Sequence, residues 1–138
     1  MSHPLIQRLH DELGYPEIDL DNHTDFVAQA GVTVLFFAGD PARYRETADL
    51  AVVLPELVAA FRDQLRPGVV ARSADVEKEL QLHYGFREWP TLVFVREGGY
   101  LGAISRIKDW SEYLELVEAI ISSEPRRPPG FKIPVVAG

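Results

Sequence analysis

The chain has 138 residues, of which 46% are hydrophobic, and this predicts a single domain with a substantial core. No apolar stretch approaches the roughly 20 residues that a membrane-spanning helix needs, and the formal net charge of −7 argues against binding a nucleic-acid backbone. The sequence contains no cysteine, which excludes disulfides, thiolate metal sites and dithiol redox chemistry.

The first part of the chain predicts two short helices and two strands. Pro4 to Leu13 carries apolar residues on one helical stripe, and Gly14 follows where that helix would end. Glu17 to Leu20 is expected to form an edge strand, and a short helix follows up to Ala30. Val32 to Phe37 is a continuous apolar run, typical of a strand that is buried on both faces.

The middle of the chain predicts a long helix, a strand and a second helix. Asp49 to Leu65 has a wide apolar helical face, and Pro55 inside it should kink the helix at a cost of about 3 kcal/mol. Pro67-Gly68 is expected to turn the chain into a third strand, Val69 to Ala71. A helix from about Asp75 to Tyr84 is expected next.

A second apolar run, Thr91 to Val95, predicts another central strand next to the first one. Pro90 precedes it and cannot donate a hydrogen bond to a sheet, which fits the first residue of a strand. The Trp89-Pro90 bond is a candidate for the cis form, because an X-Pro bond prefers trans by only about 0.5 to 1 kcal/mol.

The end of the chain predicts a strand, a helix and a tail. A strand is expected from Tyr100 to Ile107 after a turn at Gly98-Gly99, followed by an amphipathic helix that begins near Trp110. From Ser122 the composition shifts to Pro, Arg, Gly and Ser, so we expect a domain over residues 1–121 and an extended or disordered tail over 122–138. The tail ends in apolar residues that could dock on the body or on a partner: Phe131, Ile133, Val135 and Val136.

The run from Tyr84 to Leu92, with the apolar strand and Gly-Gly turn after it, resembles the cis-proline half of a thioredoxin fold. The resemblance spans about Asp19 to Ser122. It implies an α/β, three-layer fold with a mixed central sheet of four or five strands and helices on both faces. A cysteine-free chain with Phe36 to Pro41 and Val53 to Leu57 is further similar to the HyaE/HupG proteins of uptake-hydrogenase maturation.

The resemblance also indicates where a thioredoxin would carry its redox pair. Counting back from Pro55 places the two missing cysteines at Thr47 and Leu50, neither of which can carry or exchange a disulfide. The stretch from Gly39 to Glu46 also looks longer than in a thioredoxin. We therefore expect the active-site face without its chemistry, and we nominate no catalytic residue.

What remains at that face is a candidate peptide groove shaped by Trp89, Pro90 and Thr91. In thioredoxins, the backbone before the cis-proline pairs with an extended substrate peptide, which is a form of strand addition. The competing interpretation is that these residues serve only the architecture of the fold.

The acidic residues are unevenly distributed. Residues 1–60 hold ten acids against three Lys or Arg residues, whereas residues 61–138 hold eleven of each. Sign asymmetry of this kind attracts cationic partners. Four acids are candidates for a patch beside the groove, although each alone is more typical of a solvated helix face: Asp40, Glu46, Asp49 and Glu56.

The resemblance implies a non-enzymatic chaperone in the maturation of a nickel-iron uptake hydrogenase. The implied partner is the small-subunit precursor, bound before export, whose signal peptide contains twin arginines; other maturation proteins are further candidates. Charge complementarity would favour an acidic protein as its partner. A cytoplasmic location is expected, because Met1 to Pro4 lacks a basic region followed by an apolar one.

Two other functions stay open. One is a cysteine-free enzyme that handles glutathione, which would need a basic pocket where the sequence predicts an acidic one. The other is a redox-inactive dimerisation or adaptor module whose groove is idle. No metal or cofactor is expected, because the four histidines lack the spacing of metal ligands: His3, His10, His23 and His83.

Overall fold

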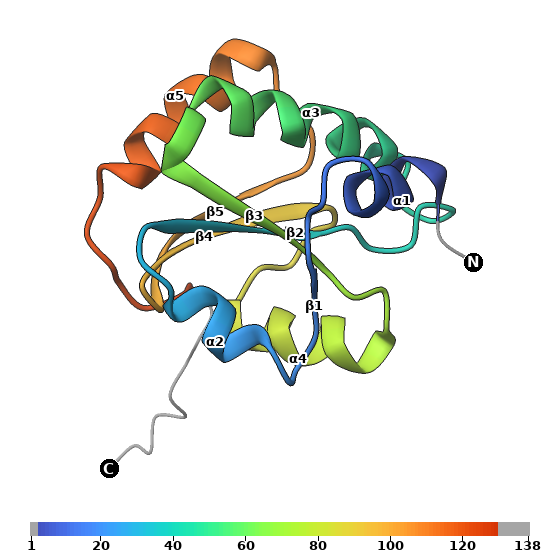
Figure 1. Cartoon of the computed structure of the whole chain (residues 1–138), viewed down its shortest axis with the longest axis horizontal. Helices are drawn as coiled ribbons and strands as arrows, with labels where there is room; N and C mark the ends of the chain where they lie inside the picture. The colour runs from blue at the N-terminus through green and yellow to red at the C-terminus, as the bar shows by residue number, and fades with distance from the viewer. Residues whose placement is uncertain (1–2, 130–138) are drawn as a thin grey trace.

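The computed structural model describes residues 3–129, which form one five-stranded sheet with helices on both faces (Figure 1). The strands lie in the order β1-β3-β2-β4-β5. The elements in chain order are α1 (Pro4–Asp11), β1 (Glu17–Ile18), α2 (His23–Ala28), β2 (Val32–Phe37), α3 (Glu46–Ala60), η1 (Arg62–Gln64), β3 (Leu65–Val70), α4 (Ala74–Tyr84), β4 (Thr91–Arg96), β5 (Gly99–Ser105) and α5 (Trp110–Ile121).

The sheet is mixed, as predicted. β1, β3 and β2 run parallel to one another, whereas β4 is antiparallel to β2 and β5 is antiparallel to β4. The two apolar runs are neighbours: Val34 of β2 lies opposite Phe94 of β4. All six residues of β2 are buried, which explains why the sequence of this strand shows no alternation of polar and apolar residues.

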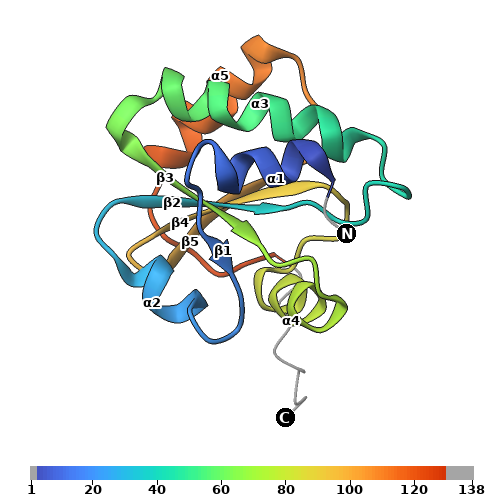
Figure 2. The same cartoon turned by 45° about the vertical axis from the view of Figure 1, so that its right-hand side comes forward.

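The helices form a layer on each side of the sheet. Figures 1 and 2 show α1, α3 and α5 over one face and α2 and α4 over the other. Successive residues of β2 serve the two layers in turn, because side chains of a strand alternate between faces. Val34 and Phe36 belong to the cluster under α3, whereas Leu35 and Phe37 belong to the cluster over α4. The predicted thioredoxin-like three-layer arrangement is confirmed.

The middle of the chain differs from the prediction in its boundaries. The helix α3 begins at Glu46 rather than Asp49 and ends at Ala60, so that Leu65 starts a strand instead of ending a helix. Pro67 and Gly68 lie within β3 and do not form a turn. β1 pairs with β3 only from Val69 onward, so the missing N–H of Pro67 faces an unpaired edge.

Gly68 shows why the turn prediction fails. A Cβ at this position would lie 2.7 Å from Cε2 of Phe26 and 2.8 Å from Cγ1 of Ile18. The glycine is therefore needed because α2 and β1 approach the strand closely, rather than for a turn.

Other elements are shorter than predicted. The helix α1 ends at Asp11 rather than Leu13, and β1 contains only Glu17 and Ile18. β5 ends at Ser105, because Arg106 has a φ of 70° and leaves the extended conformation. Pro55 lies inside α3, as predicted.

After α5, the segment 122–129 returns along the sheet. The amide of Arg126 donates to the carbonyl of Tyr100 at 2.8 Å, and the Arg96 guanidinium donates to the carbonyls of Ser123 and Ile121. The apolar residues predicted to dock, from Phe131 onward, lie outside the described residues. Within residues 3–129, no helix is long and apolar enough to cross a membrane.

Candidate functional site

The loop that enters β4 is built around a cis peptide bond between Trp89 and Pro90. The hydroxyl of Thr91 donates to the carbonyl of Glu88 at 2.5 Å, and the amide of Arg106 donates to the carbonyl of Pro90 at 2.8 Å. Both flanks of Trp89 are thereby held in place.

The backbone of Trp89 itself is open. Over residues 3–129, its N–H and C=O take part in no hydrogen bond, whereas the carbonyls of Glu88 and Pro90 on either side are both occupied. Unpaired backbone groups at a sheet margin can accept an extended segment by strand addition.

Aromatic side chains form the wall beside this loop. The rings of Tyr44 and Trp89 stack with centroids 6.2 Å apart, and Phe86 and Phe37 support the Trp89 ring from within at 5.1 and 6.2 Å. Gly39 makes the stack possible, because a Cβ there would lie 2.8 Å from Cδ2 of Tyr44 and 3.2 Å from Cβ of Trp89. Its φ of 73° also favours glycine.

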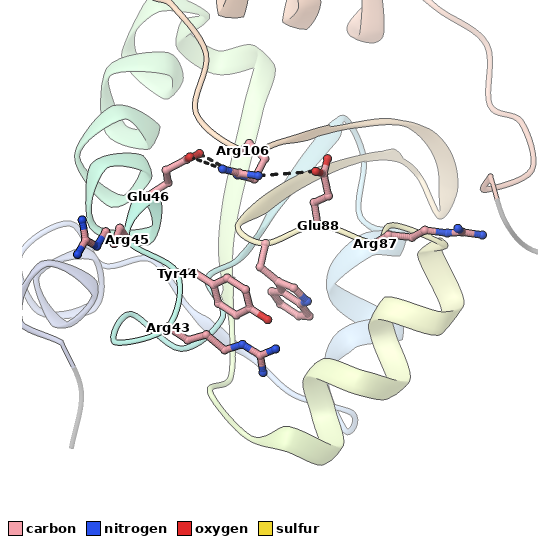
Figure 3. A pocket seen from close by; sticks show the side chains of 8 residues that line it. Arg43, Tyr44, Arg45, Glu46, Arg87, Glu88 and Arg106 are labelled. Carbon is pink, nitrogen blue, oxygen red and sulfur yellow. Dashed lines mark hydrogen bonds and ion pairs between the residues drawn. The ribbon is translucent and has the colours of Figure 1, made fainter.

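A pocket of about 440 Å³ opens at this wall (Figure 3). Its lining comes from the loop before α3, the loop before β4 and the residue that follows β5, which are far apart in sequence. The lining residues are Arg43, Tyr44, Arg45, Glu46, Arg87, Glu88, Trp89 and Arg106.

Arg106 lies between the two acids of the pocket, as Figure 3 shows. Its Nε and Nη2 donate to the Glu46 carboxylate at 3.1 and 2.7 Å, and its Nη1 lies 3.7 Å from Oε2 of Glu88. The amide of Ile107 also donates to Glu46, at 2.6 Å. The hydrogen bonds from Arg106 and then Ile107 lower the pKa of Glu46, and the same carboxylate raises the pKa of Arg106.

The four acids of the predicted patch occupy different places. Only Glu46 lines the pocket, and its carboxylate is already paired. Asp40 is exposed and borders a separate hollow that Arg72 also lines. Asp49 and Glu56 are exposed on α3 outside the pocket.

The two positions that correspond to the missing redox pair face the core. Thr47 and Leu50 are both fully buried, with 0% of their surface exposed. The Thr47 hydroxyl donates to the carbonyl of Ala38 at 2.5 Å, so it ties α3 to the end of β2. The side chains presented to the pocket come instead from residues 43–46.

The basic character of the pocket was missed by reasoning from the sequence. Four of its lining residues are arginines and two are glutamates, which gives the lining a formal charge of +2. Arg43, Arg45 and Arg87 stand directly beside the stretches already singled out, so a local count of charges would have found them. Arg106 could not be found in this way, because it reaches the pocket through the pairing of β5 with β4.

Two buried polar groups, Glu77 and His23, lie in the layer formed by α4 and α2, and the first of them contacts the loop after β2. Glu77 of α4 accepts from the amide of Gly39 at 3.2 Å and pairs with Arg72; burial raises its pKa. His23 meets the Tyr84 hydroxyl at 2.6 Å, and burial followed by the neighbouring His83 lowers the pKa of His23 to about 4. Among the described residues, no group of His, Asp and Glu is arranged to hold a metal ion.

Comparison with known proteins identifies the family to which this chain is similar. Residues 5–113 match the family model described as Hydrogenase-1 expression protein HyaE. The hydrogenase expression/formation protein HoxO of Azotobacter vinelandii is 51% identical, over 99% of this chain and 89% of that protein. HupG of Bradyrhizobium diazoefficiens, with the same description, is 44% identical over 78% of this chain and 74% of that protein.

Two solved structures are also similar. The crystal structure of a hydrogenase expression/formation protein HupG from Rhodopseudomonas palustris is 41% identical, with a TM-score of 0.55 over 78% of this chain and 95% of that one. A thioredoxin mutant from Entamoeba histolytica is 23% identical, with a TM-score of 0.54 over 75% of this chain and 97% of that one. The second similarity concerns the fold alone.

Proposed function

The chain belongs to the HyaE family of hydrogenase expression proteins, and from this premise we propose that it is a chaperone for the small-subunit precursor of a nickel-iron hydrogenase. Its role in hydrogenase maturation follows from the family. The binding partner is the part that we propose: the precursor with its twin-arginine signal peptide, met in the cytoplasm, where the precursor is made before export.

The open backbone of Trp89 carries this proposal. A signal peptide is an extended segment before it is exported, and the unpaired N–H and C=O at the cis-proline loop suit such a segment. The aromatic rings of Tyr44 and Trp89 offer apolar contact beside it.

The exposed side of α3 suits the two arginines better than the pocket does. Asp49 and Glu56 are seven positions apart and so lie on one side of the helix, with the 48% exposed Val52 between them. Export signals combine basic residues with an apolar region, which matches two carboxylates around an apolar side chain. Asp40, exposed at the end of β2, adds a further negative charge near the start of α3.

The proposed action is binding without catalysis. The positions that correspond to the redox pair hold Thr47 and Leu50, both buried, and the chain has no thiol to replace them. Binding would protect the precursor until the next maturation protein takes it over.

The test is calorimetric titration of the protein with a hydrogenase small-subunit precursor, with and without its signal peptide, at low and high salt. We expect binding that depends on the signal peptide and weakens in salt. The double variant Asp49→Asn, Glu56→Gln should weaken binding about three- to tenfold, in keeping with exposed ion pairs. The control Asp63→Asn, Glu79→Gln makes the same change in net charge on other exposed residues and should bind normally. Absence of binding to both precursor forms would refute the proposal.

One observation favours the glutathione-handling enzyme as a second candidate. That function needs a basic pocket beside the cis-proline, and the lining of four arginines and two glutamates supplies one. It also needs a thiol, which the ligand itself would have to bring. Titration with glutathione, followed by an assay of its conjugation to an aromatic halide, tests this candidate; absence of binding removes it.

A further inference from the structure

Three arginines of the pocket are without an acidic partner. Among residues 3–129, Arg43, Arg45 and Arg87 form no ion pair, whereas Arg106 is held by Glu46 and Glu88. Figure 3 shows Arg45 and Arg87 at opposite sides of the pocket. The Arg45 and Arg87 side chains extend away from each other in this view, and the Arg43 side chain lies beside Tyr44. An unpaired guanidinium group at a hollow is suited to an anionic ligand, and arginine favours the planar carboxylate.

Arg43 is the best placed of the three. Its guanidinium carbon lies 5.4 Å from the centroid of the Tyr44 ring, which in turn stacks on Trp89. A cation held over an aromatic face loses less conformational freedom when it binds than a free surface arginine does. A positive charge is therefore positioned beside the stacked rings of Tyr44 and Trp89.

The backbone of Trp89 indicates which kind of anionic ligand suits the pocket. Its unpaired N–H and C=O can both be satisfied by an extended polypeptide, but not by a free phosphate or a lipid headgroup. The net charge of −7 opposes nucleic acids and anionic membranes as well.

We propose that this pocket binds an extended peptide segment carrying a carboxylate side chain, with Trp89 pairing to the peptide backbone and Arg43 receiving the carboxylate. Arg87 and Arg45 add to the positive potential.

This inference does not rest on the signal-peptide proposal. Both proposals use the open backbone of Trp89, but the charged group of each ligand meets different residues: Arg43 of the pocket here, and the exposed acids of α3 in the signal-peptide proposal. A precursor that fails to bind would leave it unaffected, and a pocket that ignores carboxylates would leave the signal-peptide proposal unaffected.

The test uses three blocked pentapeptides, acetyl-Ser-Val-X-Val-Ser-amide, in which X is Glu, Gln or Arg. Trp89 serves as the fluorescent reporter in a Trp110→Phe background, because Trp110, the second tryptophan of the chain, is 43% exposed at the start of α5 and outside the pocket. We expect the Glu peptide to bind about three- to tenfold more tightly than the Gln peptide and the Arg peptide to bind most weakly. The preference should shrink in high salt.

Arginine variants locate the effect. Arg43→Gln should abolish the preference for Glu over Gln while leaving the weak binding of the Gln peptide in place. Arg62→Gln is the matched control, because Arg62 is exposed beyond the far end of α3, and it should retain the preference. Equal binding of the Glu and Gln peptides overturns the proposal, as does an equal loss in both arginine variants. Displacement of the Glu peptide by inorganic phosphate at matched ionic strength would identify a free-anion site and overturn it too.

Discussion

The Arg106 guanidinium donates two hydrogen bonds to the Glu46 carboxylate, from Nε to Oε1 at 3.1 Å and from Nη2 to Oε2 at 2.7 Å. The two residues are 60 positions apart in the sequence. This contact joins the end of β5 to the first turn of α3. Because Arg106 also donates its amide to the carbonyl of Pro90, one residue connects the three segments that surround the pocket.

Replacing Glu46 by Gln should lower stability at neutral pH. The contacts from Arg106 and Ile107 lower the pKa of Glu46 in the folded state, so its stabilising contribution is present above the ordinary carboxyl pKa. That contribution is lost as the pH falls through the lowered pKa. We expect the urea midpoint of the wild type to exceed that of the variant at pH 7, with the gap closing as the pH falls below the ordinary carboxyl pKa and through the lowered pKa of Glu46. Glu115→Gln, exposed on α5, is the control; a gap that persists in acid would contradict the prediction.

Replacing Gly39 by Ala should destabilise the protein by about 3 kcal/mol. The positive φ costs an alanine about 1 to 2 kcal/mol, and the new methyl group must displace Tyr44 from Trp89. Gly98→Ala is the matched control, because Gly98 has a φ of 87° with nothing within 4 Å of the added Cβ, and it should cost only the backbone part. Urea unfolding measures both, and equal losses would show that the aromatic contacts do not restrict position 39.

His23 should make stability depend on pH below neutrality. Burial, and then His83, lower the pKa of His23 to about 4 in the folded state, against about 6.5 when unfolded. The neutral ring is favoured on folding, so this stability is present above pH 6.5 and is lost as the pH falls toward 4. The unfolding constant should rise by up to about tenfold per pH unit in that window. Urea unfolding at several pH values should give His23→Gln a flatter dependence; an unchanged slope would exclude His23 as the source.

Replacing Arg96 by Gln should release the segment after α5. The guanidinium donates to the carbonyl of Ser123 at 2.9 Å and also to that of Ile121. We expect a loss of about 1 kcal/mol in urea unfolding and faster hydrogen exchange at the Arg126 amide, which donates to Tyr100. Arg62→Gln, on the exposed η1, should change stability by less than about 0.5 kcal/mol and leave that amide protected. Unchanged exchange in the Arg96 variant would contradict the prediction.

Much of the fold could be predicted because it depends on local patterns. The two apolar runs, Val32 to Phe37 and Thr91 to Val95, identified the central strands and their pairing, since only strands covered on both faces are apolar throughout. The position of Pro90 pointed to the start of a strand, since proline cannot donate to a sheet, and β4 begins at Thr91. The sequence made the cis bond a candidate only, and the structure decided it. The absence of cysteine by itself excluded dithiol chemistry.

Only the tertiary structure shows which charged side chains form ion pairs. Local patterns record whether a residue is buried, but not which distant residue lies opposite. Glu46 was expected to be a free acid of the groove, and its partner Arg106 reaches it only because β5 folds back along β4. Pro67 and Gly68 looked like a turn for the same reason, since the close approach of Phe26 and β1 is invisible in sequence. The sequence determined the sheet and the loss of redox chemistry. Long-range pairing of the strands determined that Arg106 meets the two acids of the pocket, which leaves the other three arginines of its lining without an acidic partner among the described residues.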